Sequence, residues 1–184
     1  MRVIGGKYGG RRLTSFKADH IRPTTDRVKE SVFNKLNGEL DGATVLDLFS
    51  GTGNLAFEAL SRGARSVEAV ELSHKSIAII RDNARLLNVG AELTVTNGDV
   101  IKWLGRYKGE PFGVVFADPP FTEKLAHDVL LGLAQSVAVG PDTTVMIEAS
   151  SHERVDERYP GELERFDVRD YGDKQISYFR RKGP

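Results

Sequence analysis

The sequence predicts an α/β fold in which a mainly parallel sheet carries helices on both faces. Short apolar segments with the composition of buried strands alternate along the chain with amphipathic segments of helical period. This alternation is typical of parallel sheets, because each helix crosses a face of the sheet between neighbouring strands. The C-terminal segments differ: residues 165–171 and 174–181 flank Gly172-Asp173, which predicts an antiparallel hairpin that closes the sheet.

The expected elements follow from local patterns, taken in chain order. Residues 1–12 predict two short strands around a glycine-rich turn. Val28, Val32 and Leu36 recur at every fourth position, and Pro23 with the two following threonines marks the start of this first helix. We then expect strands at residues 44–49, 66–71, 93–96, 112–117 and 143–148, and helices around residues 55–60, 77–87 and 125–133.

Length and composition indicate one main domain, residues 21–184, with a basic N-terminal β-hairpin extension, residues 1–20. The chain has no cysteine, which excludes disulfides, thiolate metal sites and a cysteine nucleophile. The four histidines lack metal-ligand spacing, so no metal is expected. No apolar segment has the length of a signal peptide or a membrane span. We therefore expect a cytoplasmic protein that does not contact a membrane, and nothing in the sequence demands more than a monomer.

The net charge of zero hides an uneven distribution. Residues 1–35 contain nine Lys and Arg but three acidic residues, a net charge of +6, and the rest of the chain carries −6. Such asymmetry indicates an end that faces a polyanion. In this stretch Tyr8 stands among Lys7, Arg11 and Arg12, and cations around an aromatic ring suit phosphates and a stacked base.

The fourth strand ends in Asp118-Pro119-Pro120-Phe121, a motif suited to binding an amino group. The prolines have a fixed φ and no N–H, so the loop offers acceptors and almost no donors. The Asp118 carboxylate and the Pro119 carbonyl can each accept one hydrogen from an amine. Phe121 would then provide a flat apolar face for the ring that carries it. This chemistry fits methylation of an exocyclic amine on an unstacked base.

The first strand ends in a glycine loop, in which Gly51 and Gly53 precede a helix. Glu71 follows at the end of the next strand, where an acid can bind the ribose hydroxyls of a nucleotide. The pattern also satisfies the NAD fingerprint. However, Asp47 would repel a pyrophosphate and would attract the sulfonium and amino groups of S-adenosylmethionine. Asp99, after the third strand, adds an acid that could accept a bond from an adenine amino group.

Together with these residues, several strings of the sequence resemble the RsmD family of S-adenosylmethionine-dependent methyltransferases, which act on guanine N2 of 16S rRNA. The resemblance covers nearly the whole length. It includes residues 2–7, 22–30, 47–55, 58–64 and 118–121. It implies a Rossmann-like seven-stranded methyltransferase fold with an N-terminal hairpin. Two residues depart from the usual family pattern: Ala56 stands where glycine is usual, and Ser50 where alanine is common.

The resemblance also implies roles for individual residues. The catalytic residues would be Asp118, Pro119 and Phe121, which hold the guanine. The cofactor, S-adenosylmethionine, with S-adenosylhomocysteine as its product, would be bound by Asp47, Phe49, Gly51, Gly53, Glu71, Leu72, Asp99, Val100, Arg22 and Thr24. The partner would be 16S rRNA, free or within the small ribosomal subunit, and the basic end would contact it through Arg2, Lys7, Tyr8, Arg11, Arg12 and Arg27.

The residues leave other functions open. Asp-Pro-Pro-aromatic does not by itself separate guanine from adenine, so an amino methyltransferase that acts on DNA adenine N6 or on protein glutamine N5 is the nearest alternative. A non-catalytic RNA-binding assembly factor that retains the fold is a second. An NAD-dependent oxidoreductase is a distant third, because the chain has one nucleotide-binding half and no candidate residue for hydride transfer.

Overall fold

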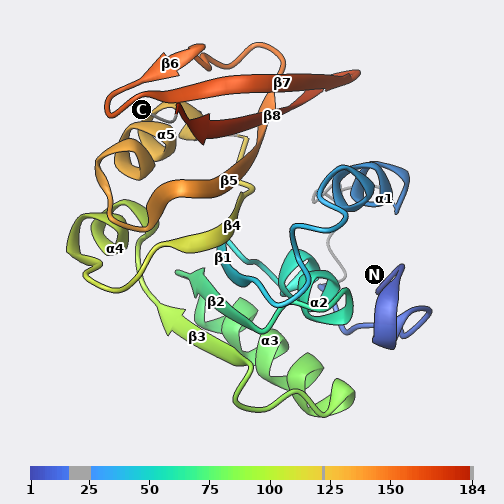
Figure 1. Ribbon diagram of the computed structural model, residues 1–184. Coiled ribbons are helices and arrows are strands. Elements are labelled where there is room, and N and C mark those ends of the chain that lie inside the picture. The colour runs from blue at the N-terminus through green and yellow to red at the C-terminus, as the bar shows by residue number, and fades with distance from the viewer. Residues whose placement is uncertain (17–25, 122, 183–184) are drawn as a thin grey trace.

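A computed structural model describes residues 1–16, 26–121 and 123–182 as one eight-stranded sheet flanked by helices (Figure 1). Arg22, Thr24 and the predicted boundary between residues 20 and 21 lie outside the described residues. The strands are Thr44–Leu48 (β1), Ser66–Glu71 (β2), Leu93–Asn97 (β3), Phe112–Ala117 (β4), Val139–Ser150 (β5), Arg158–Tyr159 (β6), Leu163–Tyr171 (β7) and Lys174–Arg181 (β8). The helices are Asp26–Lys35 (α1), Asn54–Ser61 (α2), His74–Leu87 (α3), Val100–Arg106 (α4) and Ala126–Gln135 (α5), with a short 3₁₀ turn at Gly6–Tyr8 (η1).

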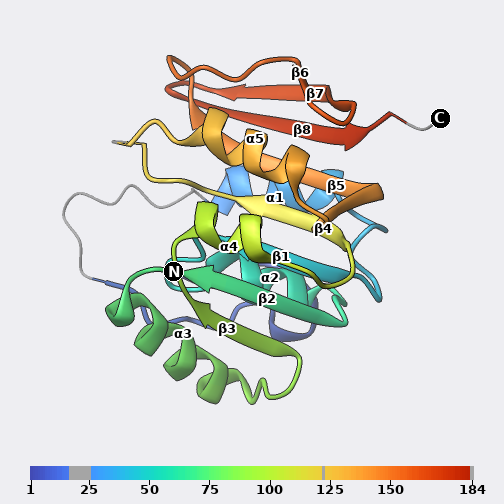
Figure 2. The same ribbon diagram turned by 90° about the vertical axis from the view of Figure 1, so that its left-hand side faces the viewer.

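The sheet runs in the order β3-β2-β1-β4-β5-β8-β7-β6, and Figure 2 shows these strands one above another, with β3 lowest. Strands β1 to β5 are mutually parallel, and β8 joins β5 in the antiparallel direction. The predicted α/β class and the C-terminal hairpin are therefore confirmed. The sheet has eight strands where the resemblance implies seven, because the two-residue β6 pairs with the outer edge of β7.

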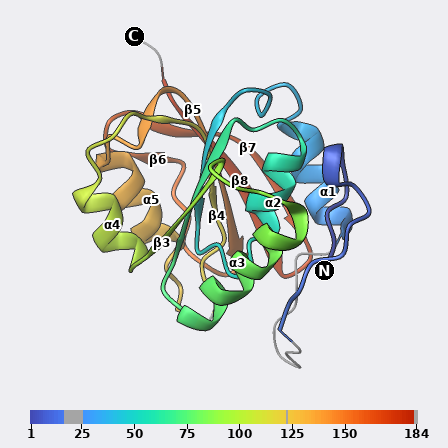
Figure 3. The ribbon, with the colours of Figure 1, turned by 90° about the horizontal axis from the view of Figure 1, so that it is seen from below.

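Helices cover both faces of the sheet, as Figure 3 shows: α1, α2 and α3 lie on one face and α4 and α5 on the other. Each face has its own apolar core, since successive residues of a strand point to opposite faces. Phe116 packs against Phe33 of α1 with ring centroids 5.3 Å apart, whereas its neighbour Val115 belongs to the core under α4 and α5. The central strands are covered on both faces, which explains their nearly continuous apolar sequences.

The N-terminal segment contains less regular β-structure than predicted. Its two arms run antiparallel, but the described residues there form a single bridge, between Arg2 and Arg12, rather than two strands. The turn at η1 lies directly against the end of α2. Gly6 has a φ of +72°, and a Cβ at this position would lie 1.8 Å from the carbonyl oxygen of Ser61. Only glycine allows this approach.

A buried carboxylate joins the N-terminal segment to the helices beneath it. Glu58 of α2 is fully buried and accepts bonds from the backbone N–H groups of Ile4 and Gly5, at 2.7 and 2.9 Å. It also pairs with the buried Lys29 of α1, at 3.3 Å, and with Arg62, at 2.8 Å. These contacts hold the pKa of Glu58 below its ordinary value, although burial opposes this. The segment is thus held against the sheet domain by polar contacts as well as by apolar packing.

Two further elements differ from the sequence-based expectation. Helix α4 was not expected, because only seven residues follow its cap at Asp99. Strand β5 begins at Val139 rather than residue 143, since Gly140 and Pro141 suggest a break that the strand in fact tolerates. Within the described ranges, the structure contains no helix long and apolar enough to cross a membrane.

Candidate functional site

Four acidic residues that the sequence predicts to be site residues lie at the carboxyl edge of the sheet, where the strand order reverses. The chain proceeds from β1 to β2 on one side, whereas β4 pairs with β1 on the other. Ligands of open α/β sheets bind outside the carboxyl ends of the strands at this point. Asp47, Glu71, Asp99 and Asp118 lie at or directly after the ends of β1, β2, β3 and β4. Among the described residues, no group of three or more His, Cys, Asp or Glu could hold a metal ion.

The glycine loop after β1 has an unusual backbone. Phe49 has a φ of 59°, which is rare for a bulky residue, and Gly51 and Gly53 also have positive φ, 56° and 83°. A Cβ at Gly53 would lie 2.6 Å from the ring of Phe57, so the loop and α2 approach as only glycine permits. In contrast, a Cβ at Gly51 would meet only the Phe49 carbonyl oxygen, at 3.9 Å. The loop is therefore tightly packed on the helix side and open at Gly51.

Asp47 is buried within this loop, with 1% of its surface exposed. Its Oδ2 atom accepts bonds from the Ser50 hydroxyl, at 2.6 Å, and from the Ala56 N–H, at 3.1 Å. Burial raises the pKa of Asp47 to about 7; Glu71 adds to this effect and the two hydrogen bonds oppose it. The two residues that depart from the family pattern thus both contact Asp47. No donor to Oδ1 is found in the described parts of the chain, so this oxygen can bind an ammonium group.

Glu71 joins the glycine loop to the end of β2. Its two carboxylate oxygens accept bonds from the N–H groups of Gly51 and Ser73, each at 2.8 Å. An ionised carboxylate offers about four acceptor positions, so two remain after these bonds. Asn97 supports the same turn by donating to the carbonyl oxygens of Glu71 and Leu72, at 3.1 and 2.9 Å. Glu71 is thus fixed in place and retains the capacity to accept bonds from a ribose diol.

The neighbouring surface combines exposed apolar side chains with a carboxylate. Leu72 and Ile101 are 64% and 38% exposed, which is high for such residues, whereas Val100 is buried. Asp99 caps α4, because one of its oxygens accepts the N–H of Lys102 at 2.9 Å. This set fits an adenine ring, with apolar contacts for its faces and an acceptor for its amino group. Together with Asp47 and Glu71, the residues present fit S-adenosylmethionine in polarity and charge.

The Asp118-Pro119-Pro120-Phe121 motif directly follows β4 and adjoins the glycine loop. The N–H of Asp118 donates to the carbonyl oxygen of Leu48 at 3.4 Å, so the first residue of the motif is bonded to the last residue of β1, where the glycine loop begins. Asp118 is half-buried, and desolvation raises its pKa to about 8. Glu148 and Asp47 contribute to this rise, and Lys174 opposes it.

Sequence reasoning missed two charged residues of this region, Glu148 and Lys174. Lys174 opens β8, and its ammonium group forms a buried ion pair with Glu148 of β5. The same ammonium lies 4.8 Å from the centroid of the Phe121 ring. Both strands contain other polar residues, so neither charge stands out locally, and nothing in the sequence shows that these strands become neighbours.

The residues expected to contact RNA are mostly exposed. Arg11, Arg12 and Arg27 are exposed, and Arg2 pairs with Asp26 at 2.8 Å while it remains largely exposed. The Lys7 ammonium lies 4.7 Å from the Tyr8 ring centroid. Tyr8 itself is half-buried, and its N–H donates to the Ser61 hydroxyl at 2.9 Å, so its ring is partly packed against the domain. The roles of these residues stay predictions.

Comparisons with known proteins agree with this architecture. The family model described as Conserved hypothetical protein 95 matches residues 1–180. The Ribosomal RNA small subunit methyltransferase D of Haemophilus influenzae is 35% identical over 80% of this chain and 78% of that protein. YlbH of Bacillus subtilis is 31% identical over the full length of both chains.

Solved structures extend the comparison. The Escherichia coli protein yhhF superposes with a TM-score of 0.87 at 29% identity, covering 99% of this chain and 98% of that one. SMU.776, whose structure was determined in complex with S-adenosylhomocysteine, covers 83% of this chain and 49% of its own length at 16% identity and a TM-score of 0.64, which shows a shared fold alone. The chain therefore belongs to the Conserved hypothetical protein 95 family, the RsmD family that its sequence resembles.

Proposed function

We propose that this protein methylates the exocyclic N2 of a specific guanine in 16S rRNA, with S-adenosylmethionine as the methyl donor. One observation carries the proposal: the acceptor motif at Asp118 and the glycine loop at Asp47 adjoin at the switch point, joined by the bond from the Asp118 N–H to the Leu48 carbonyl. A site at Asp47 suited to a nucleotide that carries a positive charge would thus border a site at Asp118 suited to an amino group. The name of the Haemophilus relative supports small-subunit rRNA as the substrate.

The cofactor half of the site would be formed by the ends of β1, β2 and β3. Asp47 would bind the amino group of the methionine part, Glu71 the ribose hydroxyls, and Asp99 with Leu72 the adenine. Phe49, Gly51 and Gly53 would shape the loop around the methionine part, and Val100 would pack beneath the adenine. When bound, the cofactor would supply a methyl group activated by a positively charged sulfur.

Asp118, Pro119 and Phe121 would hold the acceptor base. Guanine N2 is a poor nucleophile because its lone pair is delocalised into the ring. Hydrogen bonds from its two hydrogens to the Asp118 carboxylate and the Pro119 carbonyl favour a pyramidal nitrogen and stabilise the positive charge that develops there. Flipping the base costs a few kcal/mol. Stacking on Phe121 would return about 1–3 kcal/mol of this.

The N-terminal segment would bind the RNA, as the predicted division into residues 1–20 and 21–184 suggests. Arg2, Lys7, Arg11 and Arg12 add positive charge there, and Arg27 of α1 adds more. All five residues are exposed. The hydrogen bonds from this segment to the buried Glu58 would keep the bound RNA in a fixed position relative to the site. Such a role would place the protein in the cytoplasm with the ribosome.

The decisive experiment uses methyl-labelled S-adenosylmethionine with unmodified 16S rRNA, free and in assembled small subunits, followed by nucleoside analysis. We expect label in 2-methylguanosine, and the comparison of free with assembled RNA identifies the substrate form. Label in another nucleoside, or in DNA adenine or a protein glutamine tested in parallel, would overturn the guanine assignment. Cofactor binding without transfer to any of these acceptors would favour a binding module instead.

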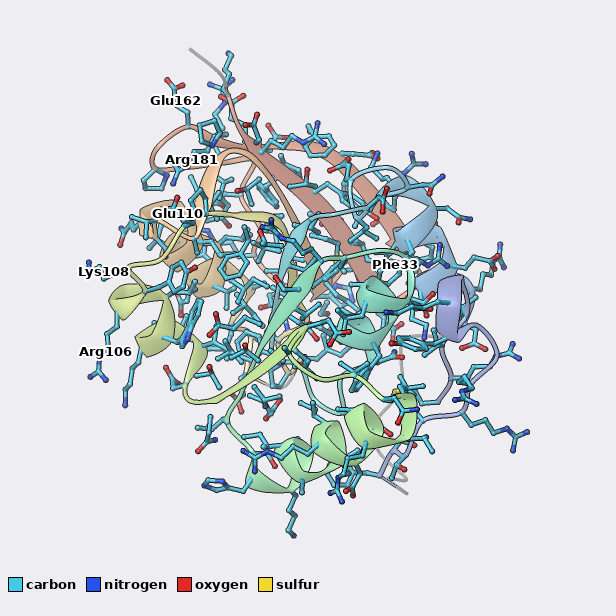
Figure 4. All side chains as sticks on the ribbon, turned by 60° about the horizontal axis from the view of Figure 1, so that its bottom comes forward. Phe33, Arg106, Lys108, Glu110, Glu162 and Arg181 are labelled. Carbon is cyan, nitrogen blue, oxygen red and sulfur yellow. The ribbon has the colours of Figure 1, made fainter. Side chains whose placement is uncertain are left out.

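The RNA-binding role of the N-terminal segment can be tested by charge reversal. We expect the Arg11→Glu/Arg12→Glu variant to bind RNA more weakly and to lower the salt slope of log K by about 2, because each lost phosphate contact contributes roughly one. The matched control is Arg106→Glu/Lys108→Glu, since these two side chains point into solvent on the opposite side of the molecule from the N-terminal segment (Figure 4). Equal losses in the two variants would show a nonspecific charge effect and contradict the assignment.

A further inference from the structure

Three side chains from distant parts of the sequence meet beside Asp118. The Lys174 ammonium contacts Glu148 and also lies 4.8 Å from the Phe121 ring centroid. The side chains of Lys174 and Glu148 are only 10% and 3% exposed. The ammonium thus joins β8 to β5 and both strands to the loop that follows β4.

The sheet register places these groups on the same face as Asp118. Phe116 of β4 is paired with Met146 of β5, so the positions two residues later, Asp118 and Glu148, continue side by side on that face. Glu148 in turn lies opposite Ile176 of β8, and Lys174 is the diagonal neighbour two residues before it. Two carboxylates and one ammonium therefore line the edge where the acceptor motif begins.

A buried ion pair at this place is not explained by stability. Desolvation of two charges offsets most of their attraction, and an apolar pair of similar volume is often as stable. The apolar cores on both faces of the sheet are extensive without this pair. A cation placed over an aromatic ring, however, fixes the orientation of that ring and occupies one of its faces.

We propose that Lys174 is a positioning residue of the acceptor site: anchored by Glu148, its ammonium holds one face of the Phe121 ring, so that the acceptor base stacks on the other face with its amine directed to Asp118. This inference rests on the proposed methyl transfer to a base. The inference adds two points to the proposed function: the face of Phe121 on which the base stacks, and a residue, Lys174, that acts through Phe121 and Asp118.

The same ammonium is the counter-charge for the acceptor carboxylate. Within residues 1–16, 26–121 and 123–182, the charged groups that act on Asp118 are Glu148 from β5, Lys174 from β8 and Asp47 from β1. Without the lysine, Asp118 would lose this cation and keep the carboxylates of Asp47 and Glu148 as neighbours, which disfavours ionised Asp118. Removal of Lys174 should therefore disturb both the position of the ring and the protonation of the acceptor.

The test compares Lys174→Met, Lys174→Arg and the double variant Lys174→Met/Glu148→Gln, with Lys182→Met as the control on an exposed lysine just after the same strand. We expect Lys174→Met to lower kcat about tenfold with unchanged cofactor affinity, and to move the acidic limb of the pH–rate profile to higher pH. The arginine variant should recover most of the rate. The double variant should recover thermal stability, because it removes the charge of Glu148 together with that of Lys174, but not kcat.

The result that overturns the proposal is a double variant with wild-type kcat and an unshifted pH profile, since Lys174 would then serve only to neutralise Glu148. A Lys174→Met variant that behaves like Lys182→Met would overturn it as well. Loss of cofactor affinity in Lys174→Met would indicate a general structural role and would also contradict it.

A second measurement does not depend on methyl transfer. Trp103 is the only tryptophan of the chain, so a Trp103→Phe/Phe121→Trp protein carries one fluorescent reporter at the acceptor ring. Adding Lys174→Met should increase acrylamide quenching and lower the fluorescence anisotropy, because the ring loses its support. Unchanged quenching would overturn the contact itself. If the wild-type protein transfers no methyl group to any RNA, the proposed function fails, and this measurement still decides whether Lys174 positions residue 121.

Discussion

The cofactor half of the site, at the ends of β1, β2 and β3, holds its carboxylates differently from the acceptor half, at the ends of β4, β5 and β8. In the cofactor half, Asp47, Glu71 and Asp99 each accept bonds from backbone N–H groups of the loops and helices that follow these strands. In the acceptor half, Asp118 is surrounded by charged side chains from other strands, with Glu148 and Lys174 nearest in the sheet. One half is fixed by local hydrogen bonds, the other by a balance of charges.

This difference has a consequence for how each half would respond to its ligand. Groups fixed by backbone bonds need little rearrangement, so they favour binding of a ligand in one geometry. A carboxylate whose pKa is raised to about 8 is largely protonated at neutral pH, and it ionises more readily when positive charge arrives beside it. The cofactor half is thus built for affinity, and the acceptor half for response to the charge of the reaction.

The largest expected effect separates the two halves by kinetics. Asp118→Ala should lower turnover roughly 10²–10³-fold, as for the loss of one preorganised electrostatic partner, while cofactor affinity stays near that of the wild type. Asp47→Ala should instead weaken cofactor binding. Calorimetry for the cofactor and single-turnover rates for methyl transfer measure the two properties separately.

The comparison would fail if Asp118→Ala and Asp47→Ala changed the same quantity. An Asp118→Ala variant with near-wild-type turnover would remove this residue from the mechanism. A loss of cofactor affinity in the same variant would mean that the two halves form one binding site without division of roles.

The contrast between the halves also explains what sequence could predict. The strands Ser66–Glu71 and Phe112–Ala117 have the predicted bounds, because each contains valines and ends next to a carboxylate and a turn. The edge position of Asp47, Glu71 and Asp118 follows from parallel topology, which needs only the alternation of strands and helices. All these signals lie within short stretches of chain.

Contacts across the sheet had no such signal. Lys174 follows Glu148 by 26 residues and Phe121 by 53, and they meet only because β8 inserts beside β5. Helix α4 was missed because seven residues give too few turns for a period to show. The path of the N-terminal segment depends on Glu58, which is buried. The sequence pattern of α2 does not show whether an acidic residue at this position is buried or exposed.

The second expected effect is on the pH dependence of stability, which should differ between the Asp118 carboxyl and a carboxyl on the surface. Between about pH 4 and pH 8, folded Asp118 retains a proton that the unfolded chain, with its pKa near 3.8, has lost. Stability of the wild type therefore falls as pH rises through this window. Asp118→Asn removes this loss, so at pH 9 it should be more stable than the wild type, with a Tm higher by several degrees.

Thermal unfolding at pH 5 and pH 9 checks this sign, with Asp142→Asn as the control, because it makes the same substitution at an exposed position. Asp142→Asn should show little difference between the two pH values. If Asp118→Asn were destabilising at pH 9, Asp118 would be held as an ionised partner of Lys174, and the acceptor half would resemble the cofactor half after all.

The third effect concerns the pH dependence of cofactor binding. Asp47, with a pKa of about 7, should bind a cationic ligand only when ionised. The fraction ionised rises about tenfold between pH 6 and pH 8, so cofactor affinity should rise about tenfold over the same range. Isothermal titration in buffers of different ionisation enthalpy should also detect proton release on binding. A flat affinity profile would show that Asp47 is already ionised in the free protein.

The smallest effect tests the hydrogen bonds that distinguish the cofactor half. Ser50 donates to Asp47 at 2.6 Å and thereby favours the ionised carboxylate. Ser50→Ala, which restores the residue common in the family, removes this bond and should raise the pKa of Asp47. Cofactor affinity at pH 7 should then fall about threefold, whereas at pH 8.5 the two proteins should differ little, because both carboxylates are largely ionised. A loss of equal size at both pH values would mean that Ser50 shapes the loop rather than the charge of Asp47. In that case the local bonds of this half would act through geometry alone.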